Sequence, residues 1–172
     1  VDRSSGQFVG TIYVSWTKFT TTTATILVSF SRNGGQTFSS PTTISVSGAN
    51  QGSVPAVGPN GEVYVAWLDF VSNSIRMARS TDGGVTFTTR NVQSVVRIPS
   101  PLPNTRFRTN SFPTLAIDPA NGNLYIAWAD NRNGNADILL TRSLDGGVTW
   151  TSPIRVNDDP TSNAQFFPWM TV

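Results

Sequence analysis

The side chains in this sequence that could do chemistry are carboxylates and guanidinium groups, because the 172 residues include no His and no Cys. The usual general base, the commonest metal ligand and the thiolate nucleophile are therefore missing. Much of the remaining charge falls in segments with the composition of loops. The candidate ligand-binding residues in these segments are Asp69, Arg97, Arg106, Arg108, Asp130, Arg132, Asp158 and Asp159.

One of these segments, residues 130–137, offers the oxygen ligands that Ca²⁺ prefers. Asp130, Asn133 and Asp137 could supply carboxylate and amide oxygens. Their spacing differs from that of an EF-hand loop, and Asn-Gly runs commonly form turns. We therefore expect no cofactor, and a calcium site at these three residues is the alternative.

The elements that must position these loops are repeated strands. Residues 60–67 (NGEVYVAW) match residues 121–128 (NGNLYIAW), and residues 10–16 (GTIYVSW) are a looser copy. The tyrosines of the three copies are 51 and then 61 residues apart. Within each copy, apolar residues alternate with others after a tight turn, which predicts a β-strand.

A second motif follows each of these strands: residues 31–38 (SRNGGQTF), 80–87 (STDGGVTF) and 143–150 (SLDGGVTW). Its Asp or Asn side chain can bond nearby backbone N–H groups, its glycines accept positive φ, and its aromatic residue is expected in the core. The motif resembles the Asp box of the sialidase (BNR-repeat) superfamily. The residues that carry the resemblance are Asn33, Gly34, Gly35, Asp82, Gly83, Gly84, Asp145, Gly146 and Gly147.

A third element, apolar and containing proline, precedes each pair of motifs. It occurs at residues 54–57 (VPAV), 112–117 (FPTLAI) and 167–172 (FPWMTV). Each repeat then supplies four strands, and four-stranded repeats of this length are typical of propeller blades. The expected fold is an all-β, sialidase-type β-propeller, with three four-stranded blades in this chain.

The predicted blades cover about residues 1–53, 54–111 and 112–166, and residues 167–172 begin or close the next blade. Residues 1–6 align with residues 117–122, so we expect the chain to open just after a first strand. Propellers usually have four to eight blades, and three would be half of a six-bladed ring. The expected partner is a second copy of the chain, or the missing blades of a longer chain.

Antiparallel blades place the Asn-Gly turns and Asp boxes on one face of the predicted propeller. The other face carries longer connections, where binding residues commonly lie. These connections are residues 18–25, 69–74 and 130–137 within blades, and residues 47–51, 97–110 and 157–165 between blades. All eight candidate ligand-binding residues fall in or beside them.

The resemblance to sialidases implies an arginine triad for the sugar carboxylate, a Tyr–Glu pair as nucleophile and an Asp as acid/base. This sequence departs from that pattern. Tyr13, Tyr64 and Tyr125 share one repeat position in a predicted core strand, and the only glutamate, Glu62, lies in a turn on the opposite face. Residues 97–99 (RIP) resemble the sialidase start motif but fall between blades. We predict no catalytic residue.

Composition also limits the possible partners and the location of the protein. The net charge is only +2 and no basic run occurs, so no nucleic-acid partner is expected. No apolar run approaches the roughly 20 residues of a membrane-spanning helix. The repeated tryptophans, and Trp169 near the end, are expected to pack in strand cores. The resemblance implies a secreted or cell-surface protein.

The first functional hypothesis is a non-catalytic sialidase-like propeller that acts as an extracellular binding or scaffold module, with a glycan as the possible ligand. One alternative is part of an exo-sialidase-like glycoside hydrolase whose catalytic residues lie in blades absent from this chain. A second alternative is a purely structural half-propeller that assembles with itself into a closed ring.

Overall fold

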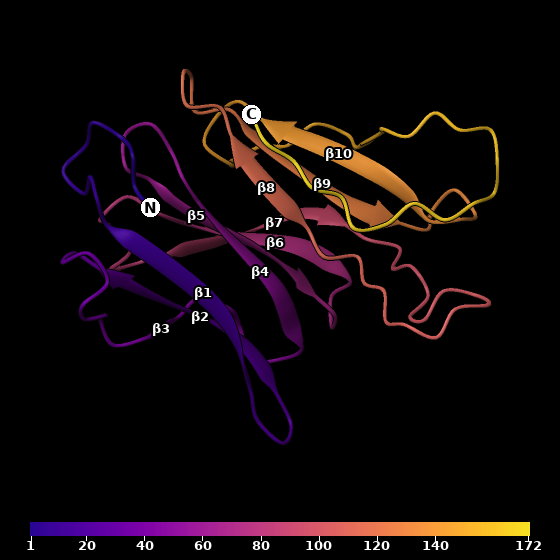
Figure 1. Ribbon diagram of the computed structural model, residues 1–172, viewed down its shortest axis with the longest axis horizontal. Coiled ribbons are helices and arrows are strands. Elements are labelled where there is room, and N and C mark those ends of the chain that lie inside the picture. Colours follow the sequence, from indigo (N-terminus) through magenta and orange to yellow (C-terminus); the bar gives the residue numbers. More distant parts are fainter.

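A computed structural model describes residues 1–172 as three antiparallel β-sheets without a helix (Figure 1). The first sheet contains β1 (Ile12–Phe19), β2 (Ala24–Ser31) and β3 (Thr42–Thr43). The second contains β4 (Asn50–Val57), β5 (Val63–Asp69), β6 (Ser74–Ser80) and β7 (Thr88–Ser94). The third contains β8 (Thr114–Ile117), β9 (Leu124–Asp130), β10 (Asp137–Ser143) and β11 (Ile154–Arg155). No element is a helix that could cross a membrane.

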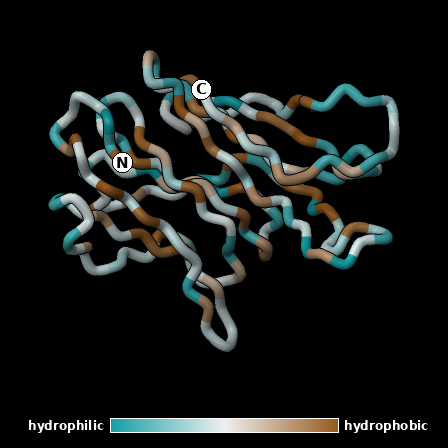
Figure 2. The backbone as a smooth tube through the Cα atoms, viewed as in Figure 1, coloured by the Kyte–Doolittle hydropathy of each residue, from teal (hydrophilic) through white to brown (hydrophobic).

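The second sheet lies between the other two and is buried on both faces. Because side chains alternate along a strand, neighbours in β5 point to opposite sheets. Trp67 packs with Ile26 of the first sheet, whereas Leu68 belongs to a core shared with Trp128 of the third. All seven residues of β5 are buried. Figure 2 shows hydrophobic residues along the strands and hydrophilic ones in many of the connecting loops.

The first sheet differs from the other two in having three strands instead of four. In the second and third sheets, β4 and β8 pair with β5 and β9, but β1 is an edge strand. The expected strand at residues 167–172 does not form, and Trp169, expected in a strand core, is 93% exposed. A strand needs a partner for its backbone groups, and these residues have none in the single chain.

The ladders divide the loops between two ends of the sheets. Val63 pairs with both Val57 and Ser80, so the Asn-Gly turns and the motifs at residues 31–38, 80–87 and 143–150 lie at one end. Asp69 pairs with Ser74 and Asp130 with Asp137, so the longer connections lie at the other end. This separation follows the prediction from the sequence.

The three repeated Ser-x-Asp/Asn-Gly-Gly motifs, residues 31–38, 80–87 and 143–150, form closely similar turns, called box turns below. In the second turn, the Asp82 carboxylate accepts hydrogen bonds from Ser80 Oγ at 2.7 Å and from the backbone N–H of Thr86 at 2.9 Å. Slight burial raises the pKa of Asp82, but hydrogen bonds led by that of the Thr86 hydroxyl outweigh it and lower the pKa to about 2. Equivalent bonds lower the pKa of Asp145.

The second glycine of a box turn lies where the preceding sheet packs. A methyl group on Gly84 (φ 86°) would lie 2.9 Å from the ring of Tyr13 in β1, and one on Gly147 would meet Met77 in β6. Gly35 (φ 88°) has no preceding sheet, and its nearest neighbour is Ile12 of its own sheet at 3.6 Å. The box turns therefore contribute contacts between sheets as well as local turns.

The aromatic residues that end the box turns are buried only where a preceding sheet packs against them. Phe87 packs on the core between the first and second sheets, and Trp150 on the core between the second and third. Phe38 was expected in the core but is 46% exposed, because no sheet precedes the first one.

Gly84→Ala and Gly35→Ala should separate two roles of the second box-turn glycine, which are contact with the preceding sheet and a backbone with positive φ. Both substitutions place a side chain at positive φ, which costs about 1–2 kcal/mol. Gly84→Ala must also displace the buried Tyr13 ring, which adds about 1–3 kcal/mol. Urea unfolding followed by tryptophan fluorescence measures both values. Equal losses in the two variants would contradict the packing role.

Stability should fall as the pH drops from about 4 to about 2. The folded-state pKa of Asp82 is about 2, below its ordinary value of 3.8, so the unfolded chain binds protons first and the folded state loses stability. The Asp82→Asn/Asp145→Asn variant should show a smaller loss. Asparagine can form this turn, because in the first box turn Asn33 Oδ1 accepts a hydrogen bond from the Thr37 N–H at 3.0 Å. Thermal unfolding at pH 2, 4 and 7 tests this, and an unchanged pH dependence in the variant would refute it.

Candidate functional site

The connections at the end opposite the box turns are joined into one surface by backbone hydrogen bonds. The N–H of Asn131 donates to the carbonyl of Val96 at 2.7 Å, and that of Gln165 donates to the carbonyl of Ala136 at 2.7 Å. These bonds link the β9–β10 loop to the segments before β8 and after β11. We call this surface the loop face, and it comprises residues 70–73, 95–113, 131–136 and 156–166.

Asp130 and Arg132, two of the predicted ligand-binding residues, are paired with each other. The carboxylate of Asp130 is fully buried and accepts from Nε and Nη2 of Arg132, each at 2.8 Å. It also accepts from Trp128 Nε1 at 2.8 Å and from the N–H of Val96 at 3.2 Å. Hydrogen bonding to Asp130 raises the pKa of Arg132. This carboxylate therefore ties residues 128–132 to the segment after β7.

Asp69, the equivalent residue of the second sheet, is also engaged within the chain. Its carboxylate accepts from Ser72 Oγ at 2.8 Å, from the N–H of Val71 at 2.9 Å and from Arg76 Nε at 3.5 Å. Burial raises the pKa of Asp69, but these hydrogen bonds outweigh it and hold the pKa below its usual value. Asp69 stabilises the β5–β6 turn.

A third cluster is built around Asp137 and Asp159. The buried carboxylate of Asp137 accepts from the amides of Asn133 at 2.8 Å and Asn157 at 2.9 Å, and pairs with Arg155 Nε at 3.0 Å. Burial raises the pKa of Asp137, but the amides and the guanidinium lower it overall. Asp159 accepts from Thr161, Asn157 and Gln165, which lowers its pKa to about 2.

The possible calcium ligands Asp130, Asn133 and Asp137 do not converge on a common centre. Asp130 and Asp137 face each other in the β9–β10 ladder, but Arg132 binds the first carboxylate and Arg155 the second. A guanidinium in contact with a carboxylate repels a second cation at the same oxygens. No group of three or more acidic side chains gathers anywhere in residues 1–172.

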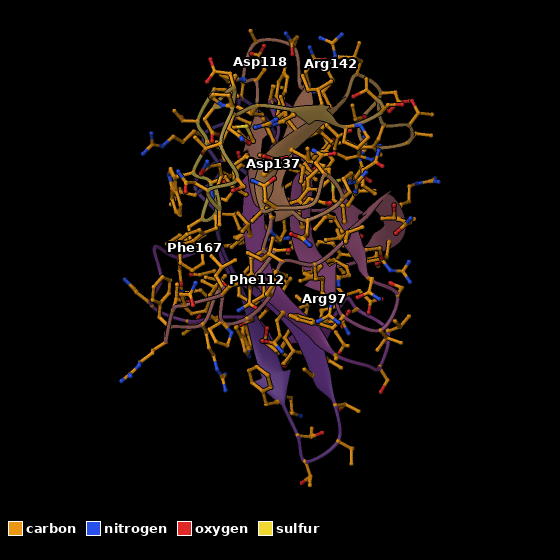
Figure 3. All side chains as sticks on the ribbon, turned by 90° about the vertical axis from the view of Figure 1, so that its right-hand side faces the viewer. Arg97, Phe112, Asp118, Asp137, Arg142 and Phe167 are labelled. Atoms are coloured by element: carbon orange, nitrogen blue, oxygen red, sulfur yellow. The ribbon has the colours of Figure 1, made fainter.

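The remaining predicted residues lie at separate places on the loop face. Arg97 donates from Nε to Asn73 Oδ1 at 2.7 Å and lies over the ring of Phe70. Figure 3 shows Arg97 well away from Asp137, so the candidates do not form one charged cluster. Those that are exposed and outside every ion pair are Arg97, Arg106, Arg108 and Asp158.

The loop face contains a hollow of about 540 Å³ between residues 99–105, 131–136 and 162–166. Its lining mixes polar and apolar surface without a charged side chain, and Phe166 forms part of the wall. The lining side chains that can hydrogen-bond are Asn104, Thr105, Asn131, Asn135, Ser162 and Asn163. Such a site offers both donors and acceptors without an ionic group.

Sequence reasoning identified the three loops around this hollow but not its residues. The predicted residues were charged, but most of the acidic ones are bonded within the chain. The available signal was the number of asparagines in residues 104–163, but Asn is equally common in turns. Which asparagines face a shared hollow depends on contacts between loops, such as that of Asn135 Nδ2 with the carbonyl of Asn163 at 3.1 Å.

The tyrosines and the glutamate lie away from the hollow. Burial raises the pKa of Tyr13 and of Tyr64, so neither hydroxyl is activated as a nucleophile. Glu62 lies at the box-turn end, where it accepts from Asn60 at 3.2 Å and lies 3.9 Å from Arg79.

Comparison with known proteins gives matches among solved structures only; no family model and no curated protein matches the sequence. An α-L-arabinofuranosidase of Fusarium graminearum (GH93), in complex with arabinobiose, is 15% identical, with a TM-score of 0.59. The match covers 90% of this chain and 47% of that enzyme.

Two intramolecular trans-sialidases are also similar. The enzyme from Ruminococcus gnavus is 18% identical with a TM-score of 0.54, over 79% of this chain and 27% of that one. The leech enzyme is 19% identical with a TM-score of 0.56, over 78% and 19%. The chain thus spans less than half the length of each of these structures. At these identities the likeness is one of fold: the three sheets are arranged as in a stretch of a sialidase-like β-propeller.

Proposed function

We propose that this chain is a carbohydrate-binding module with a sialidase-like propeller fold, which binds a glycan in the hollow of the loop face and has no catalytic group of its own. An extracellular location belongs to the same proposal. The observation that carries it is the lining of the hollow, where uncharged hydrogen-bonding side chains surround one aromatic ring.

This lining suits a neutral sugar. Each sugar hydroxyl donates one hydrogen bond and accepts others, and an amide side chain offers both functions. The side-chain amides of Asn104, Asn131 and Asn163 make no hydrogen bond within the chain, so they are free to bind a ligand. A charged ligand would leave its charge unpaired there, because no ionised side chain lines the hollow.

Phe166 supplies the apolar part of the site. Its ring lies 5.9 Å from that of Phe107 and packs on a small core that contains Ile98 and Leu102. A ring held in this way can pack against the C–H face of a sugar at little entropic cost. Amides for the hydroxyls and a ring for the C–H groups together match both surfaces of a pyranose or furanose.

Two buried carboxylates, each paired with a partly exposed arginine, give the hollow a fixed frame. Asp130 with Arg132 holds the β9–β10 loop against the segment after β7. Asp137 binds Arg155 at the end of β11 and Asn157 in the segment that follows it. Loops fixed before binding lose less conformational freedom when the ligand arrives. The charged residues therefore support binding by positioning the loops.

A glycoside hydrolase is the second candidate function. It is favoured by the similar solved structures, which are trans-sialidases and an arabinofuranosidase much longer than this chain. In that case the hollow would be one part of a substrate site, and the catalytic residues would lie in sheets that these 172 residues do not include.

Removal of single amides from the hollow should weaken glycan binding. A glycan array identifies the ligand, and titration calorimetry then compares Asn131→Ala and Asn163→Ala with the parent chain. Each lost hydrogen bond is worth about 0.5–1.5 kcal/mol, so we expect Kd to rise about 2–10-fold. Asn91→Ala, at an exposed position of β7, is the matched control and should leave Kd unchanged. If no glycan binds, the purely structural alternative is favoured.

The chain alone should hydrolyse neither a fluorogenic sialoside nor a fluorogenic α-L-arabinofuranoside above the rate in buffer. The reason is that the buried tyrosines have raised pKa values and no carboxylate lines the hollow. Turnover that is lost in Tyr64→Phe or Glu62→Gln would instead assign catalysis to this chain.

A further inference from the structure

The row of three sheets is uncovered at both ends. At the first sheet, the edge of β1 carries no paired strand, Val14 is 42% exposed and Trp16 is only half-buried. The corresponding tryptophans of the inner strands, Trp67 and Trp128, are 1% and 0% exposed. Unpaired strand edges with apolar faces are sites for pairing with another chain.

At the other end, the outer face of the third sheet is equally open. Tyr125, Leu140 and Ile154 line a shallow hollow of about 440 Å³ there, and Ile154 is 61% exposed. The corresponding face of the second sheet, with Tyr64 and Met77, is buried by the third sheet. The molecule itself thus shows what covers such a face: the next sheet in the row.

The C-terminal segment, residues 167–172 (FPWMTV), has the sequence pattern of the strand that β1 lacks. It repeats residues 112–117 (FPTLAI), whose last four residues form β8 and cover the edge of β9. Yet it forms no strand, and Phe167, Trp169 and Val172 are 57%, 93% and 57% exposed. Figure 1 shows the C-terminus at the third sheet, with strands of the second sheet between it and β1. In the single chain the segment does not pair with the β1 edge.

We propose that a second copy of this chain binds head to tail, so that residues 167–172 of each copy pair with β1 of the other. The third sheet of each copy then packs on the first sheet of its partner, as the second sheet packs on the third within the chain. Two copies of three sheets make a closed ring of six, within the usual range for propellers, and no sheet edge at either end stays open.

The register of the new strand pair follows from the existing ones. In the third sheet, Ala116 pairs with Tyr125 and Leu115 with Ile126. Thr171 and Met170 correspond to Ala116 and Leu115 in the repeat, and Tyr13 and Val14 correspond to Tyr125 and Ile126. In the proposed strand pair, Thr171 therefore lies opposite Tyr13 and Met170 opposite Val14. The N–H of Asp118 donates to Asn123 at 2.9 Å, and bonded pairs alternate in an antiparallel ladder. The N–H of Thr171 therefore points to β1, and that of Met170 points away.

The second sheet supports this assignment of which N–H groups point to the neighbouring strand. Pro55, which has no N–H, lies opposite Val65, and Val65 corresponds to Val14 of β1. The position of Met170 therefore accepts proline in an equivalent pair, whereas the position of Thr171 requires an N–H. A proline at either residue leaves the single chain unaffected, because residues 167–172 form no strand in it.

Light scattering after size-exclusion chromatography tests the proposal. The parent chain should have twice the 18.6 kDa mass of one copy. Met170→Pro should keep that mass, and Thr171→Pro should elute as a single copy with unchanged circular dichroism. A parent chain that remains a single copy at 50 µM, or two proline variants that behave alike, would overturn the proposal.

Crosslinking tests the register directly, since the chain has no Cys of its own. Val14→Cys with Met170→Cys places the two thiols in a non-hydrogen-bonded pair, where the Cα atoms are about 4.5 Å apart. With oxidised glutathione it should form a disulfide-linked pair of chains on a non-reducing gel. Val14→Cys with Thr171→Cys, one residue out of register, should not. Equal yields from both variants, or none from the first, would refute the strand exchange.

Discussion

Burial in this protein comes from one sheet lying on the face of the next, and every other feature depends on that packing. The second sheet has a neighbour on each side, and its central strand β5 is buried along its whole length. The first and third sheets have one neighbour each, and their outer faces keep Val14 and Ile154 in contact with solvent. A single sheet of this size could not bury enough apolar surface to be stable alone.

The same packing explains why the two ends of the sheets differ. At the box-turn end, the second glycines of the turns lie against Tyr13 and Met77 of the preceding sheet, so this end is constrained by close approach. At the loop end, the segments between sheets are long, and buried carboxylates hold them. Asp130 and Asp137 each bind one arginine and at least one amide, indole or backbone N–H group. Close packing thus holds the box-turn end of the sheets, and buried carboxylates hold the loop face.

The repeats allowed much of the fold to be predicted. The Tyr-x-x-Trp strands, the box turns and the division of loops between two ends follow from spacing and alternation in the sequence. Trp169 and Phe38 were predicted less well, because their burial depends on whether another sheet lies beside them and not on their own segments. The roles of Asp130 and Asp137 also escaped prediction. A carboxylate in a loop has the same sequence signature whether it binds a ligand or an arginine of its own chain.

Because the three sheets are covered to different extents, their strands should also differ in how easily they unfold locally. Local unfolding proceeds most easily where a segment loses few buried contacts, and amide hydrogen exchange reports it strand by strand. Strand β5, enclosed by both neighbours, can exchange only when the stack of sheets comes apart. In a single copy, the edge of β1 that faces away from β2 has no paired strand and is open to water. In a single chain, the second sheet is therefore protected from hydrogen exchange, and the outer sheets are less so. Stability depends on the number of sheets that pack on one another.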